Sequence, residues 1–198
     1  MSIDSLYDFI YEKASEHDFK QTLAALPFAR KSHEGQFRDG DEGIPYFLHP
    51  LAMARHAYAL GIRDDDVLAT LLLHDVVEDC DVSVDALPAS DRVKKAVSLV
   101  TFNINPGETK PDAKARYFKD IETDPLASLC KIIDRCNNIS SMAKTFSVPR
   151  MQRYLTETET YILPLIASLE HLEPSYSEYC FLLAYQIKSV LRSIKRFI

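Results

Sequence analysis

Apolar residues recur every three or four positions along most of the chain, which is the spacing that gives a helix one apolar face. Alternating runs typical of strands are few, and the 198 residues include only five glycines. The pattern therefore predicts an all-α fold that forms a single domain over residues 1–198. Its helices are expected over residues 2–14, 18–34, 49–61, 67–77, 91–101, 114–122, from 125 onward, 150–169 and 178–198.

Local signals mark several helix boundaries. Pro50 and Pro125 suit the first turn of a helix, and Gly61 suits a C-cap. Pro164 predicts a kink inside the helix of residues 150–169. The final helix, 178–198, is amphipathic, with Lys and Arg on its polar side. It could lie on a membrane surface, but we expect it to pack on the core or on another subunit.

Composition narrows the class of protein. Hydrophobic residues make up 46% of the chain and charged residues 26%, as in soluble globular proteins. The net charge of −6 argues against a nucleic-acid binder, which normally carries a basic balance. No apolar run is long enough to cross a membrane, and the N-terminal residues do not resemble a signal peptide. The four cysteines form no Cys-x-x-Cys pair, so we expect free thiols in a cytoplasmic protein.

One stretch combines apolar and ionisable residues in an unusual way. The apolar run of residues 71–73 leads directly into His74 and Asp75, and Glu78 and Asp79 follow within one turn. On a continuous helix Glu78 would lie beside both His74 and Asp75, because side chains three and four positions apart share a face. A solvated helix end would explain Glu78 and Asp79, but it explains His74 and Asp75 less well. Buried like charges need a partner, and a divalent cation would provide one.

Four residues in apolar contexts are candidate metal ligands: His49, His74, Asp75 and Asp134. They are far apart in sequence, but packing of their helices could bring them together. Two imidazoles and two carboxylates suit an octahedral ion of hard or borderline character, most plausibly Mn²⁺. Taken alone, His49 could be a capping or core histidine and Asp134 a salt-bridge partner.

These residues resemble the HD superfamily of metal-dependent phosphohydrolases. The segment from His74 to Asp79 is a more specific match. It resembles the hydrolase domain of the RelA/SpoT proteins and of their single-domain relatives, the small alarmone hydrolases of the MESH type. Further segments fit this family in order over about residues 20–170: 32–38, 45–50, 100–101, 131–138 and 150–165. The chain departs from the family pattern at Asp39, where a basic residue is usual, and at Asn137, where histidine or tyrosine is usual.

The resemblance implies an HD-domain helical bundle with its core at about residues 20–170. It also implies removal of the 3′-diphosphate from guanosine tetra- or pentaphosphate, giving GDP or GTP and pyrophosphate. It also implies that one Mn²⁺ sits on the four candidate ligands, and that Arg38 holds the base of a small-molecule nucleotide. The matching segments add Lys131, Asn138, Arg150 and Tyr154 as substrate-binding residues. From chemistry alone, Glu78 and Asp79 can orient and deprotonate water. Anionic phosphates need cations, and the candidates are Lys131, Arg135, Lys144, Arg150 and Arg153, each of which could equally be a solvated surface charge.

Two other functions stay open. The chain could be an HD phosphohydrolase for another nucleotide, such as an adenosine alarmone or a phosphorylated cofactor, and Asp39 keeps this alternative alive. It could also be an antitoxin-like binding module in which catalysis is secondary. We expect neither a nucleic acid nor a membrane as a partner, and a homo-oligomer is compatible with the sequence.

Overall fold

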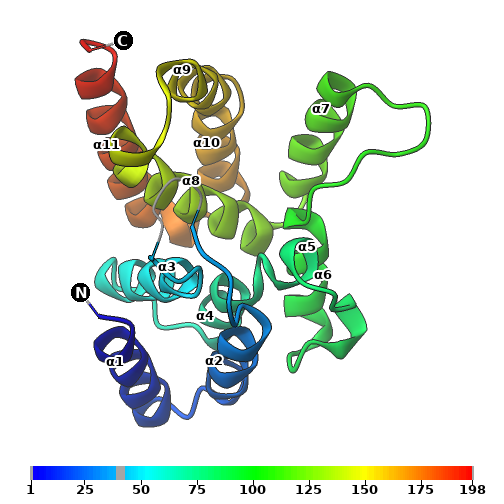
Figure 1. Ribbon diagram of the computed structural model, residues 1–198, viewed down its shortest axis with the longest axis vertical. Coiled ribbons are helices and arrows are strands. Elements are labelled where there is room, and N and C mark those ends of the chain that lie inside the picture. The colour runs from blue at the N-terminus through cyan, green and yellow to red at the C-terminus, as the bar shows by residue number, and fades with distance from the viewer. Residues whose placement is uncertain (1, 39–42, 198) are drawn as a thin grey trace.

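A computed structural model describes residues 2–38 and 43–197, apart from the side chain of Lys144. Within these ranges the chain is helical, and its one β-bridge, between Phe37 and Pro45, belongs to no strand (Figure 1). The all-α prediction is confirmed. The elements are α1 (Ile3–Glu16), α2 (Lys20–Ser32), α3 (Leu48–Ala59), α4 (Asp65–Leu73), α5 (Val76–Asp79), η1 (Val84–Ala86), α6 (Asp91–Val100), α7 (Lys110–Ile121), α8 (Pro125–Thr145), α9 (Val148–Glu157), η2 (Thr158–Ile162), α10 (Leu163–Leu172), η3 (Pro174–Tyr176) and α11 (Ser177–Ile194).

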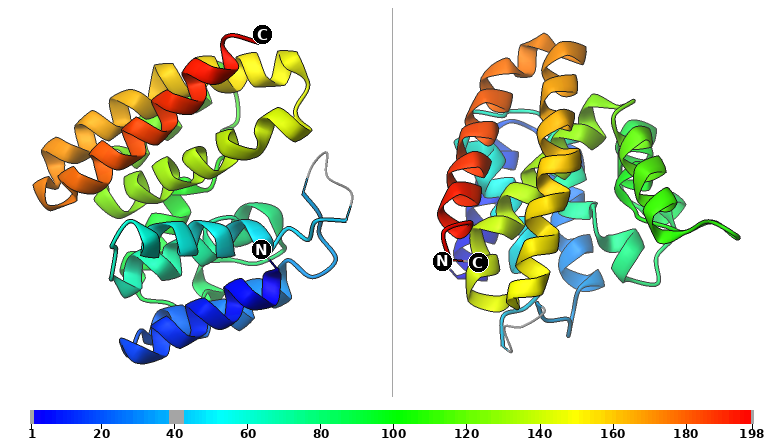
Figure 2. Two further views of the ribbon diagram at one scale, coloured as in Figure 1. Left: turned by 90° about the vertical axis from the view of Figure 1, so that its left-hand side faces the viewer. Right: turned by 90° about the horizontal axis from the view of Figure 1, so that it is seen from above.

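Helix α8 is the central element of the bundle. It packs against α3, α4 and α6, and also against α10 and α11 (Figures 1 and 2). Its start is set locally, because the Asp124 carboxylate accepts hydrogen bonds from the N–H groups of Leu126 and Ala127 and Pro125 occupies the first turn. At 21 residues α8 is long enough to contact both groups of helices.

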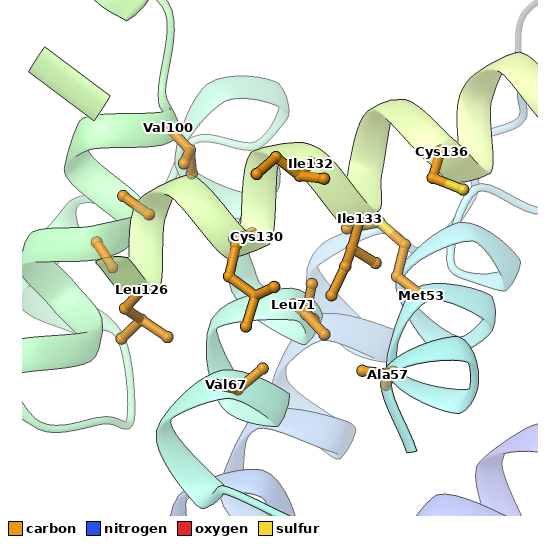
Figure 3. Packing of buried hydrophobic residues seen from close by; sticks show 14 of the residues in the cluster. Met53, Ala57, Val67, Leu71, Val100, Leu126, Cys130, Ile132, Ile133 and Cys136 are labelled. Carbon is orange, nitrogen blue, oxygen red and sulfur yellow. The ribbon is translucent and has the colours of Figure 1, made fainter. Parts of the chain in front are cut away.

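The core lies where α8 crosses α3 and α4. Figure 3 shows Cys130 and Ile133 of α8 among Leu71 of α4 and Met53 of α3, and all four side chains are buried. Every residue of α4 from Val67 to Leu73 is buried. Such a fully buried helix delivers the residues that follow it into the interior of the protein.

The predicted continuous helix over residues 67–77 is wrong in one respect. Helix α4 ends at Leu73, and α5 begins only at Val76, so His74 and Asp75 form a turn between two helices. The imidazole Nδ1 of His74 bonds the carbonyl oxygen of Leu71 at 2.9 Å. In a continuing helix that carbonyl would accept from the N–H of Asp75. The His74 side chain thus competes with the backbone N–H of Asp75 for the Leu71 carbonyl oxygen.

Two other predicted boundaries differ. Helix α7 begins at Lys110, about four residues earlier than expected, because the Thr109 hydroxyl caps its N-terminus and Pro111 fits its first turn. The helix expected over residues 150–169 is two α-helices joined by η2, a π-helical turn that ends just before Pro164. Pro164 has no N–H to donate, so an irregular turn next to it is consistent with the predicted kink.

Candidate metal and nucleotide site

A cavity of about 740 Å³ opens where residues 36–38 and 44–46 meet α3, α5, α8 and α9. Of the eleven predicted site residues, His74 alone does not line it and lies buried beside the other ligands. The ten that line it are Arg38, His49, Asp75, Glu78, Asp79, Lys131, Asp134, Asn138, Arg150 and Tyr154. The fold therefore brings together residues that are more than 100 positions apart in the chain.

The four predicted metal ligands converge at this cavity. His49, His74 and Asp134 are buried, and each offers one ligand atom such that all three atoms lie within 4.8 Å of one another. Nε2 of His49 is 3.2 Å from Oδ1 of Asp134. Oδ2 of Asp75 is 2.8 Å from Nε2 of His74 and 3.9 Å from Nε2 of His49. The geometry thus groups His49, His74 and Asp134 as a candidate metal site, with the Asp75 carboxylate beside the two imidazole nitrogens.

The hydrogen bonds of the two imidazoles leave their Nε2 atoms free for a cation. Nδ1 of His74 bonds the Leu71 carbonyl, and Nδ1 of His49 bonds Oδ1 of Asn137 at 3.0 Å. Both acceptors take a proton from Nδ1, so in the neutral imidazole each Nε2 presents its lone pair. Nε2 of His74 is buried and has no hydrogen-bond partner in the described chain, although Asp75 is close. A lone pair facing carboxylates fits a divalent cation bound between them.

The pKa values of the buried groups also bear on metal binding. Burial alone would raise the pKa of Asp134, but Lys131, His49 and His74 outweigh it and hold that pKa well below its usual range. Burial lowers the pKa of His49, so its imidazole stays neutral. Burial would also lower the pKa of His74, yet the Asp75 carboxylate raises it. Ionised carboxylates and a neutral His49 are the protonation states that a metal site needs, and a bound divalent ion would displace the proton that Asp75 favours on His74.

Asp134 is linked to the outer part of the cavity by a chain of hydrogen bonds. Nζ of Lys131 lies 2.9 Å from its Oδ2, and Nδ2 of Asn138 donates to its Oδ1 at 2.5 Å. Oδ1 of Asn138 in turn accepts from Arg38 Nη2 at 2.7 Å. Asn138 therefore positions both a candidate ligand and the arginine predicted to hold the base. The departure at Asp39 lies outside the described residues.

Tyr46 is a site residue that the sequence did not reveal. Its hydroxyl donates to Oδ2 of Asp75 at 2.5 Å. The guanidinium of Arg38 lies 5.7 Å from its ring centroid, and the ring of His33 lies 4.8 Å away. Burial, followed by the Asp75 charge, raises the Tyr46 pKa, so the hydroxyl remains a proton donor. Its place three residues before His49 in a matching motif was the only signal in the sequence.

Glu78 and Asp79 line the cavity beside Asp75. The Glu78 carboxylate accepts a hydrogen bond from the backbone N–H of Phe102 at 2.8 Å, which fixes the side chain. Burial raises the pKa of both Glu78 and Asp79, and the charge of Asp75 adds to the effect. A carboxylate with a raised pKa is a stronger base, as proton abstraction from water requires.

The predicted cations have different surroundings. Arg150 lines the cavity, and its guanidinium lies 3.8 Å from the centroid of the Phe146 ring. Arg135, by contrast, is buried outside the cavity lining, where it pairs with Glu157 and lies 4.4 Å from the Tyr154 ring centroid. Its expected contact with phosphate is therefore not supported, because its charge is used inside the bundle. Arg153 is exposed and lies outside the lining too.

Several known proteins with similar sequences carry the same activity name. No family model matches the chain. It is 33% identical over 144 residues to the human guanosine-3′,5′-bis(diphosphate) 3′-pyrophosphohydrolase MESH1, covering 68% of this chain and 78% of that one. The mouse MESH1 is 31% identical over 169 residues, covering 80% and 92%. A protein of the same activity name from Vibrio cholerae is 41% identical over 169 residues, which are 82% of this chain but 23% of that one.

A solved structure shares the fold. It is described as a metazoan orthologue of SpoT that hydrolyses ppGpp, and it superposes with a TM-score of 0.68 at 22% identity. The match covers 87% of this chain and 94% of the other. The MESH1 relatives, which this chain matches over most of their length, show the family. The chain belongs to the family of guanosine-3′,5′-bis(diphosphate) 3′-pyrophosphohydrolases.

Proposed function

We propose that this protein removes the 3′-diphosphate of guanosine tetra- or pentaphosphate as intact pyrophosphate, leaving GDP or GTP. The observation that carries the proposal is the convergence of His49, His74, Asp75 and Asp134 on one side of the cavity that Glu78 also lines. Membership of the pyrophosphohydrolase family supports the same reaction.

The four ligands would hold one divalent ion, which we propose is Mn²⁺ because the set mixes nitrogen and oxygen without sulfur. When bound, such an ion supplies Lewis acidity toward a phosphoryl oxygen and toward water. The protein keeps the ligands in place through Asn137, Asn138 and Tyr46, each of which bonds one of them. Partners of this kind fix the orientation of metal ligands.

In the reaction, oxygen from water adds to the phosphorus attached to the 3′-oxygen, and the bond between phosphorus and that oxygen breaks. Glu78 takes a proton from the attacking water, since its carboxylate is held by Phe102 and its pKa is raised. The 3′-oxygen leaves with a proton, for which Asp79 is the nearby acid with a raised pKa. The products are a free 3′-hydroxyl and pyrophosphate.

Substrate binding depends on local cations, because the protein as a whole is acidic. Lys131 and Arg150 both line the cavity and can bind phosphate oxygens. Arg38, supported by the Tyr46 ring and bonded to Asn138, can present its flat guanidinium to a purine. Tyr154 lines the same wall as Arg150.

The test is to incubate the protein with Mn²⁺ and guanosine tetraphosphate, its adenosine counterpart or simple nucleotides, and to identify the products. We expect pyrophosphate and GDP from the guanosine substrate, and no turnover by His74→Ala. His56→Ala is the matched control, because His56 bonds Gln186 away from the site. Release of orthophosphate would contradict the reaction, and cleavage of the adenosine alarmone alone would favour another nucleotide. Tight binding without turnover would point to a binding module.

A further inference from the structure

The outward face of α11 is unusual for a helix on the surface of a bundle. The opposite face, which includes Leu183 and Ile187, is buried against α8 and α10. On the outward face Phe181 is 64% exposed and Tyr185 is 66% exposed, and their rings stack with centroids 6.5 Å apart. Figure 2 shows α11, in red, lying along the outside of the molecule. The two neighbouring rings form a small apolar patch on this face.

The rest of this face is basic. Lys188, Arg192 and Arg196 are exposed, and none of them has an ion-pair partner within the described residues. Together with Tyr185, Ser189 and Ser193 they line a surface hollow of about 280 Å³. The face thus has an aromatic half toward the N-terminus of α11, where Glu178 is also exposed, and a cationic half toward its C-terminus.

We propose that this face binds the same face of a second copy of the chain, with the two α11 helices antiparallel. In that arrangement residue numbers that sum to about 373 lie opposite each other. Tyr185 then faces Lys188 of the second copy, Phe181 faces Arg192, and Glu178 faces Arg196. A twofold axis makes each contact occur twice.

The chemistry of the face selects this partner. Lys and Arg are attracted to the faces of aromatic rings, so each cation meets a ring or an acid in the antiparallel pair. A parallel pair would bring the cationic halves together instead. An anionic lipid surface would attract the basic half of α11, but it would repel the protein as a whole, because the full chain carries a net charge of −6.

The expected dimer is small and reversible. A fully buried aromatic side chain covers about 150–250 Å². At the exposures of Phe181 and Tyr185, the two rings supply roughly 250 Å² per copy, about a third of the ~800 Å² that each partner gives to a standard interface. The alkyl stems of the basic residues add to this area. Dimerisation should therefore depend on protein concentration.

The first experiment measures the mass of the intact protein in solution by analytical ultracentrifugation over a range of concentrations. We expect a monomer–dimer equilibrium in the wild type, and monomers for Phe181→Lys and for Arg192→Glu. Lys119→Glu, an exposed charge reversal on α7, is the matched control and should still dimerise. A wild-type chain that stays monomeric at every concentration would overturn the proposal. Circular dichroism checks that each variant is folded.

The second experiment tests the register. Mixing Phe181→Lys with Arg192→Glu should restore a dimer, because the lysine introduced into one copy then faces the glutamate introduced into the other. In a parallel pair these positions lie eleven residues apart, about 16 Å along the axis, and no rescue is expected. Absence of rescue would refute the antiparallel pairing. Binding of the wild type to vesicles of anionic lipid, lost in both variants without any dimer, would assign the face to membranes and would also overturn the proposal.

Discussion

Replacing Tyr46 with phenylalanine tests how the protein holds its proposed metal ligands. The change removes only the hydroxyl that donates to Oδ2 of Asp75. The ring remains, so its contacts with Arg38 and His33 are expected to stay. Any effect should therefore come from the loss of one hydrogen bond to a carboxylate that faces the imidazole of His74.

The expected magnitude follows from the type of bond. A hydrogen bond to a charged group contributes about 1.5–3 kcal/mol. Loss of a group that orients a metal ligand typically lowers metal affinity by about 10–100-fold, which corresponds to about 1.4–2.8 kcal/mol. The two ranges agree. Both describe the same loss, since Asp75 without the Tyr46 hydroxyl must hold its position by itself. Tyr46 stays protonated, so this contribution should not vary near neutral pH.

The assay titrates Mn²⁺ into metal-stripped protein by calorimetry and then measures turnover as a function of Mn²⁺ concentration. We expect Tyr46→Phe to shift both curves by about 10–100-fold and to regain most of its turnover at saturating metal. Tyr58→Phe is the control, because its hydroxyl contacts His17 at 3.3 Å, away from the cavity. Unchanged metal affinity would refute the role of Tyr46, and a loss of turnover that metal does not rescue would assign it to the chemical step.

Three further predictions follow from the site and its surroundings. His74→Ala should lose the bound metal and the activity together, and elemental analysis of a preparation that keeps full metal content would contradict the ligand assignment. Glu78→Gln keeps an acceptor for the Phe102 N–H, so turnover should fall by about 10²–10⁴-fold while calorimetry shows normal metal binding; loss of the metal would instead make Glu78 a ligand. Burial would raise the pKa of Glu157, but Arg135 and Lys114 lower it below the ordinary 4.5. A carboxylate whose pKa is lower in the folded state than in the unfolded state stabilises the fold above pH 4.5. This stabilisation is lost as the pH falls through the folded-state pKa. The free energy of unfolding, measured with chelator present, should therefore favour wild type over Glu157→Gln most above pH 4.5, and a difference that persists unchanged in acid would exclude this ion pair as its cause.

Much of the fold and of the site could be read from the sequence. The three-to-four-residue spacing of apolar side chains indicates helices regardless of how they pack, which is why the all-α class was predictable. The chemistry of the site was visible because imidazoles and carboxylates in apolar surroundings need a partner. The sequence accordingly predicts His49, Asp75 and Asp134 as candidate ligands, and all three line one cavity.

Other features depend on contacts between distant segments. No glycine or proline marks the turn at His74 in the sequence. The turn arises because the His74 imidazole hydrogen-bonds to the Leu71 carbonyl oxygen. Nothing in the sequence near Tyr46 shows that its hydroxyl reaches Asp75, 29 positions away. Arg135 follows the candidate ligand Asp134 in the sequence, yet it pairs with Glu157 and does not line the cavity. Local sequence determines which residues form helices. The direction and the partner of each polar side chain depend instead on how those helices pack, because packing decides which distant residues become its neighbours.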